Sequence, residues 1–241
     1  MLQNLCFKEM HDRYVRIAHA HEKTLEWLFV SPDRSCERTS FTAWLQADDQ
    51  PVYWITGQAA AGKSTLMKFL VDDQRKNEHL ALWRGDRRLF VAWFFFCRSG
   101  TFLEKSLEGL VRSLLHQILT QAPELIPVSL PDRDSKGQPV GKQLSGDNTC
   151  NWSREALINA LGVCIRKATT TYMSKVVLFI DGLDEMEGHL EELMSFLMIL
   201  QGPGIKLCVA SRRLPVFENA LGQCPQLRVC ESTYRDIEEF V

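Results

Sequence analysis

Residues Val52–Thr65 read VYWITGQAAAGKST, and this stretch decides the fold. Its first part, Val52–Thr56, is apolar and has the length of a buried strand. The pattern G-x4-G-K-S follows at Gly57–Ser64, and helical periodicity runs over Lys63–Arg75. A glycine-bounded loop between a strand and a helix is typical of a P-loop, which binds nucleotide phosphates. An ordinary glycine-rich turn with an incidental lysine is the alternative, and the flanking pattern disfavours it.

The chemistry of phosphate binding accounts for these residue types. Gly57 and Gly62 permit backbone angles that turn N–H groups inward, and the start of the next helix adds positive potential. Lys63 supplies a charge for the β and γ phosphates, and the Ser64 hydroxyl is placed to bind Mg2+. Thr65 either contacts the α phosphate or packs in the helix. The candidate phosphate-binding residues are Gly57, Gln58, Ala59, Ala60, Ala61, Gly62, Lys63, Ser64 and Thr65.

Buried strands alternate with helices along the chain. The expected strands are Val52–Thr56, Leu89–Phe96, Val176–Ile180, Ile205–Ala210 and Leu227–Val229. The expected helices are Lys63–Arg75, Lys105–Gln121, Arg154–Lys167, with Ser153 as its N-cap, and Leu190–Leu200. This alternation predicts a three-layer α/β fold with a mainly parallel, five-stranded sheet.

Changes in composition divide the chain further. Residues 1–50 form a lead-in, in which Ile17–Phe29 has apolar positions at helical spacing. Residues 51–234 form the nucleotide-binding domain. Within it, 127–150 is polar and rich in Pro and Gly, which predicts a mobile insertion. Residues 235–241 look like the start of a further helical domain.

A second motif, VVLFIDGLDE at Val176–Glu185, ends a strand in acid. The carboxyl edge of a parallel sheet is where ligands bind, so we expect Asp181 to bind Mg2+. Gly182 stands where many hydrolysing P-loop ATPases have Glu. Asp184 or Glu185 then becomes the candidate to polarise the attacking water. A solvated acidic turn is the alternative interpretation of these two residues.

Arginines follow two other strands. Arg212, after Ile205–Ser211, is the candidate sensor of the γ phosphate, with Arg213 as a solvated neighbour. A surface arginine pair at a strand end is the alternative. Arg98 lies at the same edge as a further candidate. Because the chain has no NKxD segment, adenine nucleotide (ATP or ADP) is favoured over guanine.

Composition excludes several classes of protein. The chain has 241 residues, enough for one α/β domain, with 28 Lys and Arg against 30 Asp and Glu. Without a basic block, a nucleic-acid partner is not expected. The eight cysteines have no zinc-type spacing, and the longest apolar runs are strand-sized. We therefore expect reduced, mostly buried thiols, no membrane span and a cytoplasmic location.

Taken together, the motifs resemble NACHT domains of STAND-class P-loop NTPases, in particular those of fungal NLR-like proteins of the heterokaryon-incompatibility type. The matching segments are YWITGQAAAGKSTLMKFL, FFFCRSG followed by SLEGLVRSLLHQIL, VVLFIDGLDE and KLCVASRRL. The lead-in LCFKEMHDRYVRIAHAHEKTLEWLF is also similar, so the resemblance covers nearly the whole chain.

The resemblance implies a switch that holds ADP at rest, exchanges it for ATP and then forms a homo-oligomer that recruits an effector. In fungi such switches serve non-self recognition, a form of innate immunity, and regulated cell death. The family's roles would fall on Gly62–Thr65 and Asp181 for phosphates and Mg2+, on Asp184 or Glu185 for hydrolysis, and on Arg212 as sensor. His21 and Thr24 become candidates for adenine contact, although a helix packing on the sheet edge explains their spacing equally. A full-length relative would add helical, winged-helix, effector and repeat domains.

Three functions follow from these features. The first is a nucleotide-binding switch with slow Mg-dependent ATP hydrolysis. The second is a turnover P-loop ATPase or kinase, although a kinase needs an Arg-rich lid and the only long loop, 127–150, contains a single arginine. The third is a non-catalytic fragment that retains only the fold.

Overall fold

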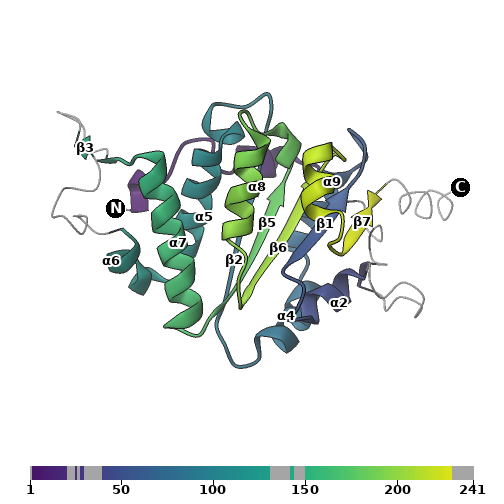
Figure 1. The fold of residues 1–241 in the computed structure, drawn as a ribbon, viewed down its shortest axis with the longest axis horizontal. Helices are drawn as coiled ribbons and strands as arrows, with labels where there is room; N and C mark the ends of the chain where they lie inside the picture. Colours follow the sequence, from purple (N-terminus) through teal and green to yellow (C-terminus); the bar gives the residue numbers. More distant parts are fainter. Residues whose placement is uncertain are drawn as a thin grey trace, which may run out of the picture.

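A five-stranded sheet forms the centre of the molecule (Figure 1). The computed structural model describes residues 2–20, 25, 28–29, 40–130, 142–143 and 150–229. The strand order is β2-β5-β6-β1-β7, and every neighbouring pair is parallel. The strands are β1 (Val52–Thr56), β2 (Leu89–Phe95), β5 (Lys175–Asp181), β6 (Ile205–Ser211) and β7 (Gln226–Arg228). The predicted α/β fold with a parallel sheet is confirmed.

Helices cover both faces of the sheet. The α-helices are α1 (Asp12–Arg16), α2 (Phe41–Gln46), α3 (Lys63–Asp72), α4 (Arg75–Arg84), α5 (Leu107–Gln121), α6 (Ile126–Ser129), α7 (Arg154–Thr170), α8 (Leu190–Ile199) and α9 (Pro215–Leu221). Short 3-10 turns lie at Leu2–Asn4, Leu103–Lys105, Pro123–Leu125 and Leu183–Glu185. As expected, the Ser153 side chain caps α7 by accepting from the Ala156 N–H.

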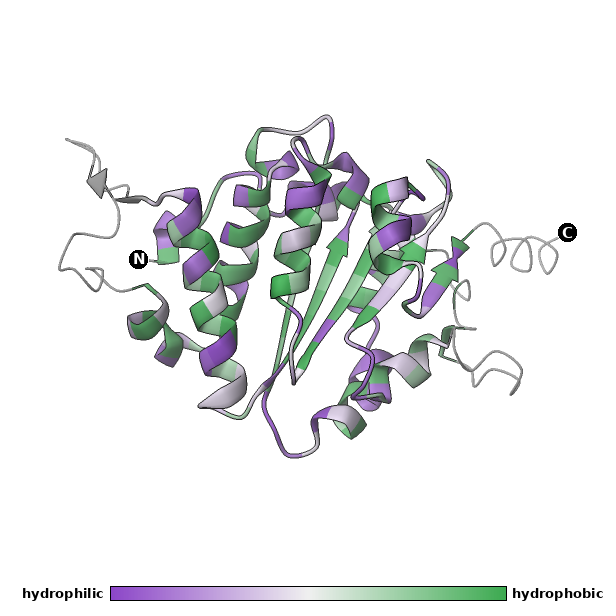
Figure 2. Ribbon diagram, viewed as in Figure 1, coloured by the Kyte–Doolittle hydropathy of each residue, from purple (hydrophilic) through white to green (hydrophobic). Residues whose placement is uncertain are grey.

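Alternate strand residues supply two separate cores. In β1, Val52 and Trp54 join the core under α5, α7, α8 and α9, whereas Tyr53 and Ile55 join the core under α2, α3 and α4. Both faces of β1, β5 and β6 are therefore buried, which explains why these strands are mostly apolar, apart from Lys206 and the residues at the strand ends. Figure 2 shows the strands mostly green between helices whose outer faces carry more purple.

The strand order brings distant motifs to one edge. Because β6 lies between β1 and β5, Thr56 pairs with Ser211 and Ile180 pairs with Val209. The loops after β1, β5 and β6 therefore leave the carboxyl edge side by side, which is the ligand-binding edge of such sheets.

Several expected helices differ in the structure. Residues 17–20 are not helical, because α1 ends at Arg16 and Ile17 has extended backbone angles, so a helix starting at Ile17 is wrong. The helix from Lys63 ends at Asp72, since Asp73 turns away and its carboxylate accepts from the Arg75 N–H at the start of α4. The sequence interpretation missed α2, α4 and α9.

The segment 127–150, expected to be irregular, begins regularly. It contributes most of α6. It also contains β3 (Lys142–Gln143), which pairs antiparallel with β4 (Cys150–Asn151) at the end of the segment. Leu130 is buried in the core, so this part of the segment is packed. Residues 230–241, with the expected start of a helical domain, lie outside the described residues.

Among the described cysteines, Cys97, Cys164 and Cys208 are buried, as expected, whereas Cys6 is exposed.

Candidate functional site

The loop after β1 turns into α3 through two residues with left-handed backbone conformations. Gly62 adopts a left-handed conformation with φ 88° and caps the start of α3, where its carbonyl accepts from the Leu66 N–H. Ala60 is also left-handed, with φ 60°, although it is not a glycine. Gly57 does not have a positive φ, so the special angle expected there falls on Ala60 instead.

Lys63 is folded back onto the loop that precedes it. Its ammonium donates to the carbonyls of Gly57 and Gln58 at 2.9 and 2.6 Å. The charge therefore lies beside the backbone of the loop, at the cavity that the loop lines.

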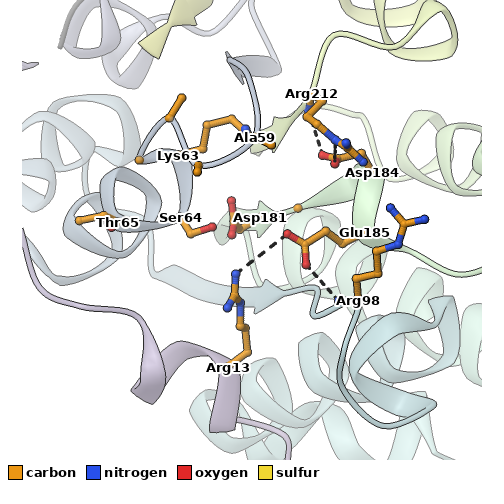
Figure 3. Close-up of a pocket in the computed structure, with 14 residues that line it drawn as sticks. Arg13, Ala59, Lys63, Ser64, Thr65, Arg98, Asp181, Asp184, Glu185 and Arg212 are labelled. Atoms are coloured by element: carbon orange, nitrogen blue, oxygen red, sulfur yellow. Dashed lines mark hydrogen bonds and ion pairs between the residues drawn. The ribbon is translucent and has the colours of Figure 1, made fainter. Parts of the chain in front are cut away.

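Asp181, at the end of β5, faces the Ser64 hydroxyl (Figure 3). Its side chain is buried, and within the described part of the chain neither carboxylate oxygen reaches a hydrogen-bond donor in good geometry. Burial raises the pKa of Asp181 to about 6, which the nearby Ser64 hydroxyl opposes and Glu185 reinforces. No cation pairs with this buried carboxylate in the described part of the chain, an arrangement that favours binding of a metal ion.

The residues present fit a magnesium ion. Mg2+ takes one or two carboxylates or hydroxyls, completed by phosphate oxygens and water. Asp181 and Ser64 match that requirement, whereas no group of three His, Cys, Asp or Glu side chains among the described residues forms a closed metal site.

Gly182 explains why the next acidic residues are Asp184 and Glu185 and why no glutamate directly follows Asp181. It is left-handed, with φ 73° and ψ 38°, and starts the turn Leu183–Glu185. A glutamate at this position would be strained, since side chains rarely adopt these angles. The turn instead returns Asp184 and Glu185 to the same cavity as Asp181.

The two acids have different partners. Asp184 accepts from the Arg212 backbone N–H at 2.8 Å and from Arg212 Nε at 2.5 Å. Glu185 accepts from the Arg98 backbone N–H at 3.0 Å and lies 4.0 Å from Arg13. Both oxygens of Asp184 are therefore engaged with Arg212, while Glu185 is held more loosely.

These residues enclose one cavity of about 480 Å3 at the carboxyl edge. It is lined by Arg13, Ala59, Ala60, Ala61, Gly62, Lys63, Ser64, Thr65, Arg98, Asp181, Gly182, Asp184, Glu185 and Arg212. A second hollow of about 530 Å3 shares Ala59 and Arg212 with it and contains Gly57, Gln58 and Arg213. The structure thus brings together the loop, the acidic strand end and Arg212.

Three residues of the N-terminal segment differ from the rest of the site in how the sequence predictions compare with the structure. His21 and Thr24, the candidates for adenine contact, lie outside the described residues. Arg13 was not singled out by the sequence analysis, because its place in the cavity depends on how α1 docks onto β2 and α3. Its neighbours in the sequence, HDRYVR, contain no spacing signal for that docking.

None of the helices in the described ranges combines the length and apolar character that crossing a bilayer requires.

Comparison with known proteins places these motifs in context. Residues 23–212 match the family described as Nephrocystin 3, N-terminal. The vegetative incompatibility protein HET-E-1 of Podospora anserina is 26% identical over 188 residues, which is 77% of this chain but 12% of that protein. These matches confirm the resemblance to NACHT domains of fungal incompatibility-type proteins.

Similarity to solved structures is more distant. A structure of Drosophila ORC bound to DNA aligns with a TM-score of 0.40 and 16% identity, covering 78% of this chain and 39% of that one. A bacterial conjugative coupling protein, TrwBdeltaN70, aligns with a TM-score of 0.23 and 13% identity, covering 83% and 67% respectively.

Proposed function

Because the chain belongs to the family described as Nephrocystin 3, N-terminal, we propose that it is the ATP- and ADP-binding module of an NLR-like signalling switch. The observation that carries the proposal is Asp181, a buried carboxylate that faces Ser64 and the P-loop and has no cationic partner among the described residues. Such an arrangement is costly unless a cation binds there. A nucleotide with Mg2+ is the ligand whose chemistry suits both the loop and the carboxylate.

The loop 57–65 would hold the phosphates through backbone N–H groups and the charge at the start of α3. Lys63 would leave the carbonyls of Gly57 and Gln58 and turn to the β and γ phosphates. Ser64 and Asp181 would hold Mg2+, which, when bound, supplies neutralisation of charge on the phosphate oxygens. Thr65 lines the same cavity and is the candidate for the α phosphate.

Hydrolysis would be slow, because the groups that assist it are engaged elsewhere. Of the two acids, Glu185 is the better candidate to orient water, since both oxygens of Asp184 are bound to Arg212. Arg212 would report the γ phosphate, but it must first leave Asp184. A switch that retains its nucleotide needs this kind of restraint more than a turnover enzyme does.

The biological role extends beyond this chain, which spans 12% of HET-E-1. We place it in fungal non-self recognition or regulated cell death, with activation through a homo-oligomer in the cytoplasm. His21 and Thr24 remain proposed adenine contacts. Helical, winged-helix, effector and repeat domains of a longer protein would be its partners.

The test begins with the nucleotide that copurifies with the chain, released by denaturation and identified by chromatography. We expect ADP, and with added Mg-ATP a turnover far below the roughly 10 per second of an ordinary enzyme. Lys63→Ala should abolish nucleotide binding, whereas Lys167→Ala, an exposed lysine on α7, should not. Equal nucleotide affinity in wild type and Lys63→Ala would refute the proposal, and rapid steady-state turnover would favour a turnover ATPase.

A further inference from the structure

Arg13 reaches the phosphate cavity from the N-terminal segment, 44 positions before Gly57 in the sequence. The helix that carries it, α1, is fixed to the sheet domain on two sides. Tyr14 stacks on Trp93 of β2, with ring centroids 4.1 Å apart. Lys68 of α3 is buried and donates to the carbonyls of Tyr14 and Ile17 at 3.0 and 2.9 Å. Arg13 is therefore held by the same helix that begins at the P-loop.

The guanidinium of Arg13 is poorly satisfied where it lies. One terminal nitrogen is 4.0 Å from Glu185, the outer limit of an ion pair, and both side chains are about one-third exposed, at 32% and 29%. The Nε–H is buried and has no acceptor among the described residues. A long ion pair between such groups stabilises little, whereas a buried donor without an acceptor is costly. The contact with Glu185 alone therefore does not account for the position of Arg13.

Two of the other three basic side chains that line the cavity are already engaged, and the third, Arg98, is exposed. Arg212 is bound to Asp184, and Lys63 is bound to the loop carbonyls. Figure 3 shows Arg13 and Arg212 approaching the acidic end of β5 from opposite sides, with Arg13 on the side of Ser64 and Asp181 and Arg98 beside Glu185. Arg13 thus lies on the side of the cavity where the proposed metal would lie, and its buried Nε distinguishes it from the exposed Arg98.

We propose that Arg13 binds the terminal phosphate of a nucleoside triphosphate and so adds affinity for triphosphate that a diphosphate does not receive. The inference rests on the proposed function of the site. A guanidinium offers several N–H donors in a plane, which matches phosphate oxygens, and a γ phosphate beside Asp181 supplies the acceptor that Nε lacks. A diphosphate has no oxygen there, because its last phosphate is held by the loop.

The same movement would change Glu185. When Arg13 turns to phosphate, one oxygen of Glu185 loses its only cationic neighbour within 4.0 Å among the described ion pairs, while the other keeps the Arg98 N–H. Triphosphate binding would thereby free Glu185 to accept a proton from water.

The test measures binding of two probes with magnesium by calorimetry: ADP and the non-hydrolysed adenosine 5′-(β,γ-imido)triphosphate. We expect Arg13→Gln to weaken triphosphate binding by about tenfold or more while ADP affinity stays within about twofold. Arg16→Gln is the matched control, because Arg16 lies on the same helix, is exposed and pairs with Asp12. It should leave both affinities unchanged.

The outcomes separate the two proposals. If wild type binds neither probe, the proposed function fails, and the role of Arg13 fails with it. If wild type binds both and Arg13→Gln leaves their ratio unchanged, or weakens both equally, only the role of Arg13 is overturned and its contact with Glu185 is structural. If Arg13→Gln does not fold, Arg13→Lys carries the same test, since it keeps the charge but not the planar donors, and the same selective loss is expected.

Discussion

Arg212 and Asp184 hold each other at the carboxyl edge of the sheet through two hydrogen bonds, one from the Arg212 backbone N–H and one from Nε. The Asp184 side chain is 6% exposed, so this carboxylate has little access to water. The position of Arg212 is therefore fixed by Asp184, three positions beyond Asp181, so the segments after β5 and β6 are joined at the cavity.

We predict that this pair contributes measurably to stability. In a double-mutant cycle of Asp184→Asn and Arg212→Gln, the coupling free energy of unfolding should be about 1–2 kcal/mol, because the carboxylate is buried. Urea unfolding of the nucleotide-free protein measures it. The neighbouring Arg213–Glu218 pair is the control, since both side chains are about 40% exposed, and its coupling should be below about 1 kcal/mol. Equal couplings for the two pairs would contradict the prediction.

Asp181→Asn should raise the stability of the nucleotide-free protein and impair its proposed binding of magnesium. Replacing a buried, unpartnered carboxylate by a neutral amide removes an uncompensated charge, so the nucleotide-free protein should become more stable by about 1–3 kcal/mol at pH 7. The same change should remove the dependence of nucleotide affinity on magnesium. Urea unfolding in chelator and titrations with and without Mg2+ measure the two effects. A loss of stability would show that the carboxylate has a partner in the free protein.

Ala60→Gly should stabilise the loop. Ala60 has φ 60°, a conformation that costs an L-residue about 1–2 kcal/mol, while glycine adopts it freely at some cost in unfolded-state entropy. The net gain in unfolding free energy should be up to about 1 kcal/mol. Ala59→Gly, one position earlier and without a positive φ, should instead destabilise slightly. Thermal unfolding of both variants measures the two changes in stability. A stabilising effect of Ala59→Gly would contradict the prediction.

Lys206, at the opposite edge of the sheet, should make the free energy of unfolding depend on pH. Lys206 is buried, donates to the carbonyls of Trp44 and Ala47 and lies 4.8 Å from the Trp83 ring. Burial lowers the pKa of Lys206 to about 8, with Asp48 opposing and Lys175 reinforcing the shift. Between pH 8 and about 10.5 the unfolded chain then binds more protons than the folded protein, so stability contributed by this group rises with pH.

The comparison that isolates the group is Lys206→Met, which keeps the apolar stem. The difference in unfolding free energy, wild type minus variant, should increase between pH 8 and 10, by no more than about 1.4 kcal/mol per pH unit. Urea unfolding at several pH values measures it. A difference that is constant over this range would mean that Lys206 titrates normally.

The sequence predicts the sheet well and the lead-in poorly, for physical reasons. Strands such as Val52–Thr56 are buried on both faces, so their apolar runs are unbroken and their limits are clear. In contrast, α4 reads RKNEHLALWR, a mostly polar segment whose helical state depends on its contact with α2. Ile17 and Leu28 have the spacing of buried helix residues, yet Ile17 is buried by docking rather than by continuing α1.

The same distinction applies to the site. The P-loop and Asp181 are predictable because local spacing and strand ends specify them. The partner of Asp184 and the position of Arg13 are not, since each depends on which strands and helices become neighbours. Gly182 is intermediate: its presence in place of glutamate is visible in the sequence, but its reason is a left-handed turn.

The placement of β6 between β1 and β5 has a consequence for the order of folding. The phosphate loop follows β1, but Trp54 of that strand donates to Ser211 of β6, 157 positions later. Pairings this far apart in sequence are slow to form, because loop closure costs entropy before the contact stabilises the chain. During synthesis, the P-loop emerges long before the strand that supports it. The proposed nucleotide binding would thus be a late event, and we expect a ribosome-bound chain to acquire it only after residue 211 has left the exit tunnel.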